Sequence, residues 1–197
     1  MREGGGRESL PALIVVSGRA GSGKSTLARA LSRRMHIACV DYDTASEPFI
    51  RAVLERDGKR DFSAYAKAFR ETAYKVVLDV GFENLASGVD VIVSGPFGKE
   101  STEAGYFARL SQQYGCSFKS VVLEIVVTEG VLKKRITERR SDRDARKIEQ
   151  WDDFMASTEM QKRAWSPDVR IEVDETGDAD LDTIVTRLER ELKTVIQ

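Results

Sequence analysis

The chain has 197 residues, of which 41% are hydrophobic and 32% are charged, and its formal net charge is −1. These values are typical of a soluble globular protein, and we expect a single domain over residues 1–197. The near-neutral charge argues against a nucleic-acid partner and against a membrane surface. The lone histidine, His36, argues against a His-based catalytic triad and a multi-histidine metal site.

Residues 1–9 are polar and glycine-rich, and we expect them to form a flexible N-terminus. The apolar run at 10–16 is too short to span a bilayer and has no cleavage-site signature, so the simplest expectation is a cytoplasmic protein without a membrane partner. Cys39 and Cys116 lie far apart with no C-x-x-C motif, and we expect two buried thiols rather than a disulfide or a metal pair.

Short runs rich in Val and Ile alternate with longer helical patterns along the chain. The strands predicted from these runs cover residues 12–17, 37–41, 89–94, 121–127 and 169–173. The predicted helices cover residues 24–35, 44–56, 62–86, 102–114, 129–140, 145–165 and 181–195. This alternation favours a doubly wound α/β domain, with a parallel sheet covered by helices on both faces.

The predicted helix at 62–86 has an apolar stripe that is interpreted as core packing rather than ligand contact. Asp61 or Ser63 is expected to cap this helix. The stripe consists of Phe62, Tyr65, Phe69, Ala73, Val76 and Val80.

The most specific motif is the phosphate-binding pattern G-x-x-x-x-G-K-S/T between the first predicted strand and the first predicted helix. Its glycines let the backbone curl so that consecutive N–H groups and the positive end of the helix can hold phosphate oxygens. Lys24 can reach the β- and γ-phosphates, and the Ser25 hydroxyl can ligate Mg²⁺. The predicted nucleotide-binding residues are Gly18, Ala20, Gly21, Ser22, Gly23, Lys24, Ser25 and Thr26.

Other classes of P-loop protein fit the sequence less well. A GTPase needs an Asn-Lys-x-Asp motif, but Leu85 follows the only asparagine, Asn84. The run Asp174-Glu175-Thr176-Gly177 mimics the GTPase D-x-x-G, but lies far beyond the P-loop and is interpreted as coincidence. The strand at 91–93 does not end in the Asp-Glu pair of motor ATPases, and no LSGGQ signature of transporters is present.

Two aspartates, Asp41 and Asp43, close the second predicted strand. The carboxyl ends of neighbouring parallel strands face the same crevice as the P-loop. Carboxylates there can orient the Mg²⁺ shell and accept a proton from an attacking hydroxyl. A solvated acidic turn is the alternative interpretation.

A basic stretch at 132–147 carries eight Lys and Arg against three Asp and Glu. Arg135, Arg139 and Arg143 are spaced by four, which places them on one helix face if the helix continues. Mobile guanidinium groups can stabilise the charge of a transferring phosphoryl group and exclude water, so we expect a lid. The alternative is a solvated charged helix.

With these motifs in view, the chain resembles the small P-loop kinases. It looks most like the shikimate and gluconate kinases and the chloramphenicol phosphotransferase-like members of the AAA-type ATP-binding kinases. The segments that carry the resemblance are GRAGSGKST at 18–26, DYD at 41–43, SGPFG at 94–98, KKRITERRSDRDAR at 133–146 and VDETGD at 173–178.

The resemblance implies a five-stranded parallel sheet of order 2-3-1-4-5, ATP as the phosphoryl donor and Mg²⁺ as its cofactor. It implies that Asp43 acts as the base near the acceptor hydroxyl and that Asp41 lies on the water shell of the metal. Gly95 and Pro96 would line the acceptor side.

The lid and its flanking helices would span residues 129–166. Arg135 or Arg139 would stack on adenine, and Arg139 or Arg143 would touch the transferred phosphate. Thr176 and Gly177, in the stretch 174–178, would border the adenine. The chain lacks the His-Pro element of gluconate kinases and a clear shikimate-binding arginine set, so the resemblance does not name the acceptor.

The sequence therefore favours an ATP-dependent kinase that acts on a small hydroxylated molecule. One alternative is a kinase of a nucleotide sugar, as in toxin-like relatives, or of a polynucleotide 5′-hydroxyl. Another is an ATP-binding regulatory protein that hydrolyses ATP slowly and signals through the lid. The sequence leaves the oligomeric state open.

Overall fold

A computed structural model of the chain describes residues 9–159, 163–173 and 180–196. Its five strands form one parallel sheet in the order β2-β3-β1-β4-β5, which confirms the predicted fold class and strand order. The strands are β1 (Ala12–Gly18), β2 (Ala38–Asp41), β3 (Val91–Ser94), β4 (Lys119–Val127) and β5 (Val169–Val173).

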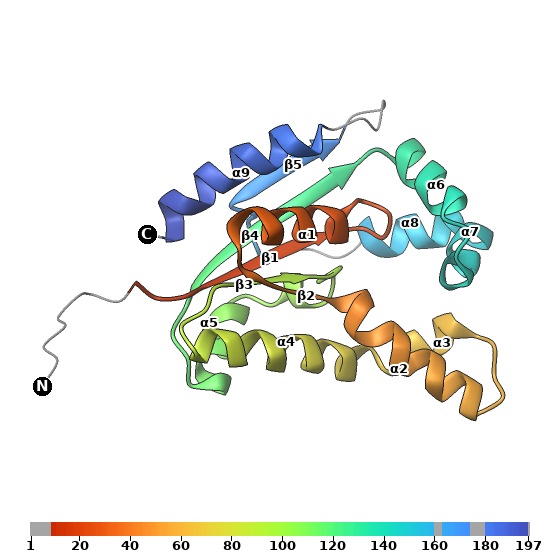
Figure 1. Ribbon diagram of the computed structural model, residues 1–197. Coiled ribbons are helices and arrows are strands. Elements are labelled where there is room, and N and C mark those ends of the chain that lie inside the picture. The colour runs from red at the N-terminus through yellow and green to blue at the C-terminus, as the bar shows by residue number, and fades with distance from the viewer. Residues whose placement is uncertain (1–8, 160–162, 174–179, 197) are drawn as a thin grey trace, which may run out of the picture.

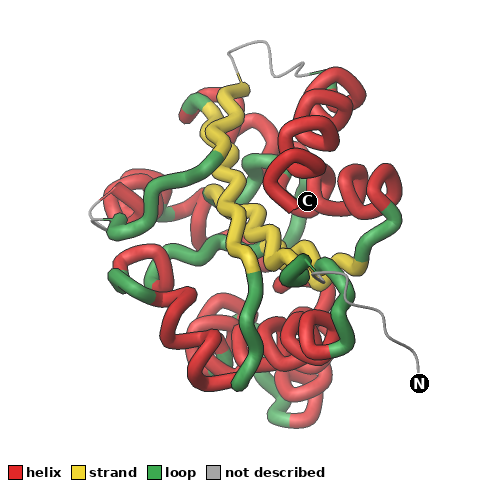
Figure 2. The backbone as a smooth tube through the Cα atoms, turned by 90° about the vertical axis from the view of Figure 1, so that its left-hand side faces the viewer, coloured by secondary structure: helices red, strands yellow, loops and turns green. Residues whose placement is uncertain are grey.

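Helices cover both faces of this sheet, as Figure 1 shows. Helices α1 (Lys24–Met35) and α9 (Leu181–Ile196) lie on one face, and α4 (Arg70–Ala86) and α5 (Tyr106–Tyr114) lie on the other. Figure 2 views the strongly twisted sheet from the side, with helical layers around it. The remaining helices are α2 (Tyr42–Arg56), α3 (Phe62–Ala68), α6 (Glu129–Glu138), α7 (Ala145–Glu149) and α8 (Trp151–Glu159), with short 3₁₀ turns η1 (Glu100–Thr102) and η2 (Asp142–Asp144).

The alternation of side chains along β1 builds two separate cores. Ile14 and Val16 pack under α1 and α9, whereas Leu13 and Val15 pack against α4 and α5. All four side chains are fully buried, because successive residues of a strand point to opposite faces and both faces are covered. This central strand is thereby fixed on both sides, and the loop that follows it starts from a rigid position.

The strand order reverses around β1, which lies between β3 and β4. In open α/β sheets, such a reversal opens a crevice at the carboxyl ends of the strands. Helices α2 and α3 and the segment α6–α8 extend beyond this end of the sheet in Figure 1. A ligand site at the carboxyl ends of the strands is therefore expected between these two groups of helices.

Three predicted helices differ most from those observed. The predicted helix at 62–86 is split at Phe69 (ψ 7°), because α3 packs on α2 whereas α4 packs on the sheet. The predicted helix at 145–165 is broken at Gln150 into α7 and α8. The helix predicted at 129–140 ends at Glu138, since Arg140 adopts the left-handed region with φ 49°.

The predicted apolar stripe at 62–80 is wrong at Val76 and Val80. Both are exposed on α4, whereas Ala73 of the stripe is buried. The face of α4 that meets the sheet also contains Tyr74, Val77 and Phe82. The stripe does not continue in phase from α3 to the end of α4, because the helix is broken at Phe69. The predicted cap is confirmed, since Asp61 accepts a hydrogen bond from the backbone of Ala64.

Cys39 and Cys116 are both free, but each is half-buried rather than fully buried. Burial is the largest cause that raises the pKa of Cys39, to about 11. Within the described residues, no helix is both long and apolar enough to cross a membrane.

Candidate active site

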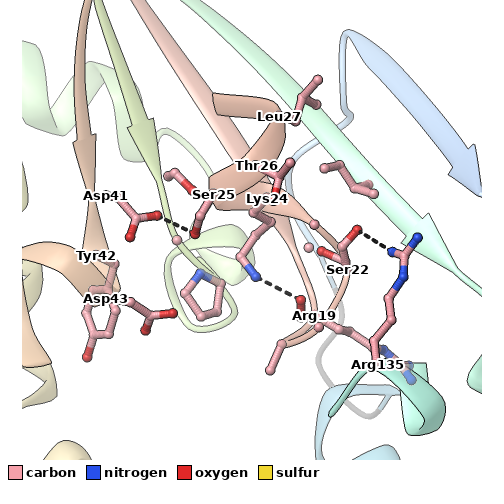
Figure 3. A pocket seen from close by; sticks show the side chains of 18 of the residues that line it. Arg19, Ser22, Lys24, Ser25, Thr26, Leu27, Asp41, Tyr42, Asp43 and Arg135 are labelled. Carbon is pink, nitrogen blue, oxygen red and sulfur yellow. Dashed lines mark hydrogen bonds between the residues drawn. The ribbon is translucent and has the colours of Figure 1, made fainter. Parts of the chain in front are cut away.

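A cavity of about 670 Å³ opens at the carboxyl ends of the strands. Its walls are supplied by the loop after β1, the start of α2, the loop after β3 and the segment 135–147. The close view in Figure 3 shows side chains from the first two walls beside Arg135 of α6. These segments are distant in the sequence and meet around one space, together with residues of α3, β5 and α9.

The loop between β1 and α1 has the shape that phosphate binding requires. Gly21 and Gly23 have φ of 82° and 98°, a region that residues with a side chain rarely adopt. Every residue predicted to bind nucleotide phosphates, from Gly18 to Thr26, lines the cavity. A Cβ on Gly21 would lie 2.8 Å from Cγ1 of Ile136, so this loop packs directly against α6.

Lys24 is the first residue of α1, and its side chain is almost completely buried. Its Nζ donates to the carbonyl oxygen of Arg19 at 2.8 Å, across the mouth of the loop (Figure 3). Burial lowers the pKa of Lys24 to about 8, although the carboxylates of Asp43 and Asp41 act to raise it. The ammonium group is therefore held inside the loop, where a phosphate would complete its interactions.

Ser25 and Asp41, the two residues predicted to hold Mg²⁺, contact each other directly. The Ser25 hydroxyl donates to Oδ2 of Asp41 at 2.6 Å, and Asp41 also accepts from the backbone and the hydroxyl of Thr44. The last two bonds cap α2, which explains why this helix begins at Tyr42 rather than at the predicted residue 44. Burial raises the pKa of Asp41, but the hydrogen bonds from Ser25 and Thr44 outweigh it and the net pKa is lowered.

The oxygen atoms of Ser25 and Asp41 fit Mg²⁺, a hard cation that prefers oxygen ligands and keeps several waters. Within residues 9–159, 163–173 and 180–196, no group of three or more His, Cys, Asp or Glu gathers as in an all-protein metal cage. One carboxylate and one hydroxyl are the donor set expected where a nucleotide supplies the remaining ligands.

Asp43 lies in the first turn of α2, with its side chain about half exposed to the cavity. One guanidinium nitrogen of Arg143 contacts Oδ2 of Asp43 at 3.1 Å and Oε2 of Glu47 at 2.9 Å. Glu47 also binds Arg51, which in turn binds Asp142. The start of α2 is therefore tied by ion pairs to the turn η2.

Arg135, Arg139 and Arg143 all line the cavity, as predicted, but they do not share one helix face. Of these three residues, Arg135 lies within α6, Arg139 is the C-cap residue that follows the helix, and Arg143 lies in η2. The chain reverses between them at Arg140, so a turn rather than a helical repeat brings Arg143 back to the cavity.

The side chain of Arg135 donates to the backbone oxygen of Ser22 at 3.3 Å, beside the phosphate loop (Figure 3). Apolar residues of β5 and α9 border the same cavity, among them Val173 and Leu181. Thr176 and Gly177, which were predicted to border adenine, fall outside the described residues.

Gly95 and Pro96 also line the cavity, as predicted, and their loop is held by Tyr74. The hydroxyl of Tyr74 accepts a hydrogen bond of 2.8 Å from the backbone of Phe97. Tyr74 is thus a support behind the loop rather than a residue of the cavity wall.

One wall of the cavity is formed by residues of α2 and α3 that were not predicted from the sequence. The break at Phe69 lets α3 pack on α2 beside the cavity. Within the described part of the chain, these lining residues are Ser46, Glu47, Ile50, Phe62, Ser63 and Ala66.

Comparison with known proteins agrees with this geometry. The family described as an AAA domain matches residues 13–160, and the chain belongs to that family. A search of curated proteins finds no match.

Solved structures share the fold at low sequence identity. A candidate kinase from Chloroflexus aurantiacus is 19% identical with a TM-score of 0.68, covering 92% of this chain and 98% of that chain. The APS kinase of Mycobacterium tuberculosis, in complex with AMPPNP and APS, is 17% identical with a TM-score of 0.57, covering 94% and 99%. Shikimate kinase from Bacteroides thetaiotaomicron is 18% identical with a TM-score of 0.52, covering 92% and 98%. The fold is that of the small P-loop kinases.

Proposed function

We propose that this protein transfers the γ-phosphoryl group of ATP to a hydroxyl group of a small molecule. One observation carries the proposal: a single cavity brings together the phosphate loop with Lys24, the carboxylate of Asp43, and the lid residues Arg139 and Arg143. The APS kinase of similar fold, in complex with AMPPNP and APS, provides a precedent for this use of the fold.

The nucleotide side of the mechanism consists of positioning. The backbone N–H groups of the loop hold the phosphate oxygens, and Lys24 places its charge between the β- and γ-phosphates. Ser25 and Asp41 would hold Mg²⁺, which neutralises charge on the phosphate oxygens when it is bound. Arg135 flanks the loop on the side where the base of the nucleotide would extend.

On the acceptor side, Asp43 accepts the proton of the attacking hydroxyl. The acceptor oxygen forms a bond to the γ-phosphorus while the bond from that phosphorus to the bridging oxygen of ADP breaks. Arg139 and Arg143 stabilise the charge that develops on the equatorial oxygens. Because Arg143 already bridges Asp43 and Glu47, it must exchange these partners for phosphate oxygens as the nucleotide enters.

A transfer screen with γ-labelled ATP and Mg²⁺ tests the proposal, using sugars, nucleosides, polyols, and aminoglycoside or phenicol antibiotics as acceptors. We expect label to appear on at least one hydroxyl compound. Asp43→Asn should lower that rate by about 10²–10⁴-fold while the affinity for AMPPNP is retained, because the lost group acts on the acceptor.

Glu55→Gln is the matched control, since Glu55 is an exposed carboxylate on the same helix. Its rate should equal that of the unsubstituted protein. If both variants bind and hydrolyse ATP normally and no acceptor is labelled, the protein is a nucleotide-binding regulator instead.

A further inference from the structure

Asp144 is a fully buried carboxylate that does not border the cavity. Its side chain is 0% exposed, and it lies at the end of η2, in the turn between α6 and α7. Burying a carboxylate is costly unless partners compensate its charge. The partners of Asp144 should therefore explain its position.

Two cations share this carboxylate. Arg139 donates to Oδ2 through Nε at 2.8 Å and also through Nη2, and Lys147 donates to Oδ1 at 2.7 Å. Arg139 caps the C-terminal end of α6 and Lys147 belongs to α7, so Asp144 joins the two arms of the turn. Both cations line the cavity, although the carboxylate behind them does not.

Arg139 and Lys147 lie close enough to Lys24 to affect its ionisation. Burial is the largest cause that lowers the pKa of Lys24, and the positive charges of Arg139 and Lys147 add to this effect. Three cations thus gather at the phosphate end of the cavity. The carboxylates of Asp43 and Asp41 counter this repulsion at Lys24. Arg139 and Lys147 also repel each other, and a negative charge between them would hold both in place.

Asp144 can supply that charge. Burial raises its pKa, but the hydrogen bonds and charges of Lys147 and Arg139 outweigh burial, and the net pKa is lowered. The group is therefore ionised at neutral pH. Asp142, two residues earlier in the same turn, is largely exposed and binds Arg51 of α2 instead.

Given the proposed function, we propose that Asp144 is a positioning residue that presents Arg139 and Lys147 to the transferring phosphoryl group. Asp144 acts through these two side chains and does not touch the nucleotide. The charge of Asp144 therefore affects the reaction indirectly, by fixing the positions of the two cations.

The Asp144→Asn variant tests whether Asp144 affects turnover, through the positions of Arg139 and Lys147, more than it affects nucleotide binding. We expect the turnover of ATP·Mg²⁺ to fall by about 10–100-fold, because small displacements of charged groups weaken transition-state stabilisation. The dissociation constant for AMPPNP should change by less than about threefold, because two effects oppose each other. Displaced cations weaken binding, and the removal of a negative charge near the phosphates strengthens it. Asp152→Asn, at an exposed position on α8, is the control and should leave both values unchanged.

A double-mutant cycle tests whether Asp144 acts through its two partners. In a protein that already carries Arg139→Ala and Lys147→Ala, adding Asp144→Asn should change turnover by less than about twofold. A loss of the same size in both backgrounds would overturn the proposal, as would equal losses in turnover and AMPPNP affinity. If Asp144→Asn does not fold, Asp144→Glu keeps the charge, displaces the carboxylate and should show the same split.

The failure of this inference can be distinguished from the failure of the proposed function. If the unsubstituted protein neither hydrolyses ATP nor transfers phosphate, the proposed function fails. Hydrogen exchange over residues 139–147 then decides the role of Asp144. Protection of this segment by AMPPNP should be reduced in Asp144→Asn and retained in Asp152→Asn, and an equal response of the two variants would contradict the role.

Discussion

The two ends of the cavity are built by different means. At the phosphate end, the loop after β1 takes its shape from the backbone, with Gly21 and Gly23 in the left-handed region and Lys24 buried. At the end that we propose for the acceptor, called the acceptor end below, the wall contains ion pairs in which Arg143 bridges Asp43 and Glu47. The first end keeps its form through backbone geometry and packing against α6, whereas the second keeps its form through ion pairs between its own side chains.

This difference shows how one fold can serve many substrates. A backbone loop binds what every nucleotide has in common, and its geometry tolerates little change. Ion pairs at half-exposed positions contribute little to stability, so they can be replaced at small cost. We therefore expect substitutions at the phosphate end to have large effects. Apart from the proposed base Asp43, substitutions within the ion pairs of α2 should have small ones.

Among the changes that compare the two ends of the cavity, the largest effect is expected for Lys24→Ala. Phosphoryl transfer should fall by about 10²–10³-fold, because a preorganised charge in a water-excluded site is lost. The fold should remain, since the glycines set the shape of the loop; far-ultraviolet circular dichroism and steady-state kinetics check both parts. The control is Arg33→Ala, which removes an exposed cation from the same helix and should leave the rate unchanged.

An intermediate effect is expected when the affinity for AMPPNP is measured at increasing pH. Burial lowers the pKa of Lys24 to about 8, so the cationic form that binds phosphate is present below pH 8 and is lost as the pH rises above it. Affinity for AMPPNP should therefore fall about tenfold between about pH 7 and pH 9. Calorimetry over this range measures the change.

The same titration in Lys24→Met provides the control for this pH effect, because the methionine side chain has no ionisable group. Its affinity should be low and nearly independent of pH. An equal dependence on pH in both proteins would assign the titration to another group and would contradict the placement of Lys24 at the phosphates.

The smallest effect is expected for Glu47→Gln on α2. This change weakens the pairs of Glu47 with Arg143 and Arg51, and transfer should change by no more than about fivefold, since partly exposed pairs are worth little. Steady-state kinetics beside Glu55→Gln measure the difference. A loss above about 100-fold would show that the acceptor end is as fixed as the phosphate end.

Sequence reasoning worked where the structure depends on local chemistry. The phosphate loop is specified within nine consecutive residues, at 18–26, and the pair of Ser25 and Asp41 follows from the rule that neighbouring parallel strands end at the same edge. Most of the five strands were predicted for the same reason, because buried parallel strands are continuous apolar runs.

The sequence was less informative where a turn decides the geometry. Extending a helical repeat from Arg135 to Arg143 predicted one face, whereas Arg140 reverses the chain. Asp144 could not be singled out, because one aspartate among many charged residues looks solvated until its burial is known. The wall formed by α2 and α3 was also missed, since the break at Phe69 has no glycine or proline to mark it.

The contact between Gly21 and Ile136 has a consequence for variation within the family. The phosphate-binding pattern allows any residue at the position of Gly21, so phosphate binding alone does not select glycine there. Two features select glycine at this position: its φ of 82°, and the distance of only 2.8 Å between a Cβ added there and Cγ1 of Ile136. Relatives with alanine at this position should have a smaller side chain in place of Ile136, and the two positions should co-vary.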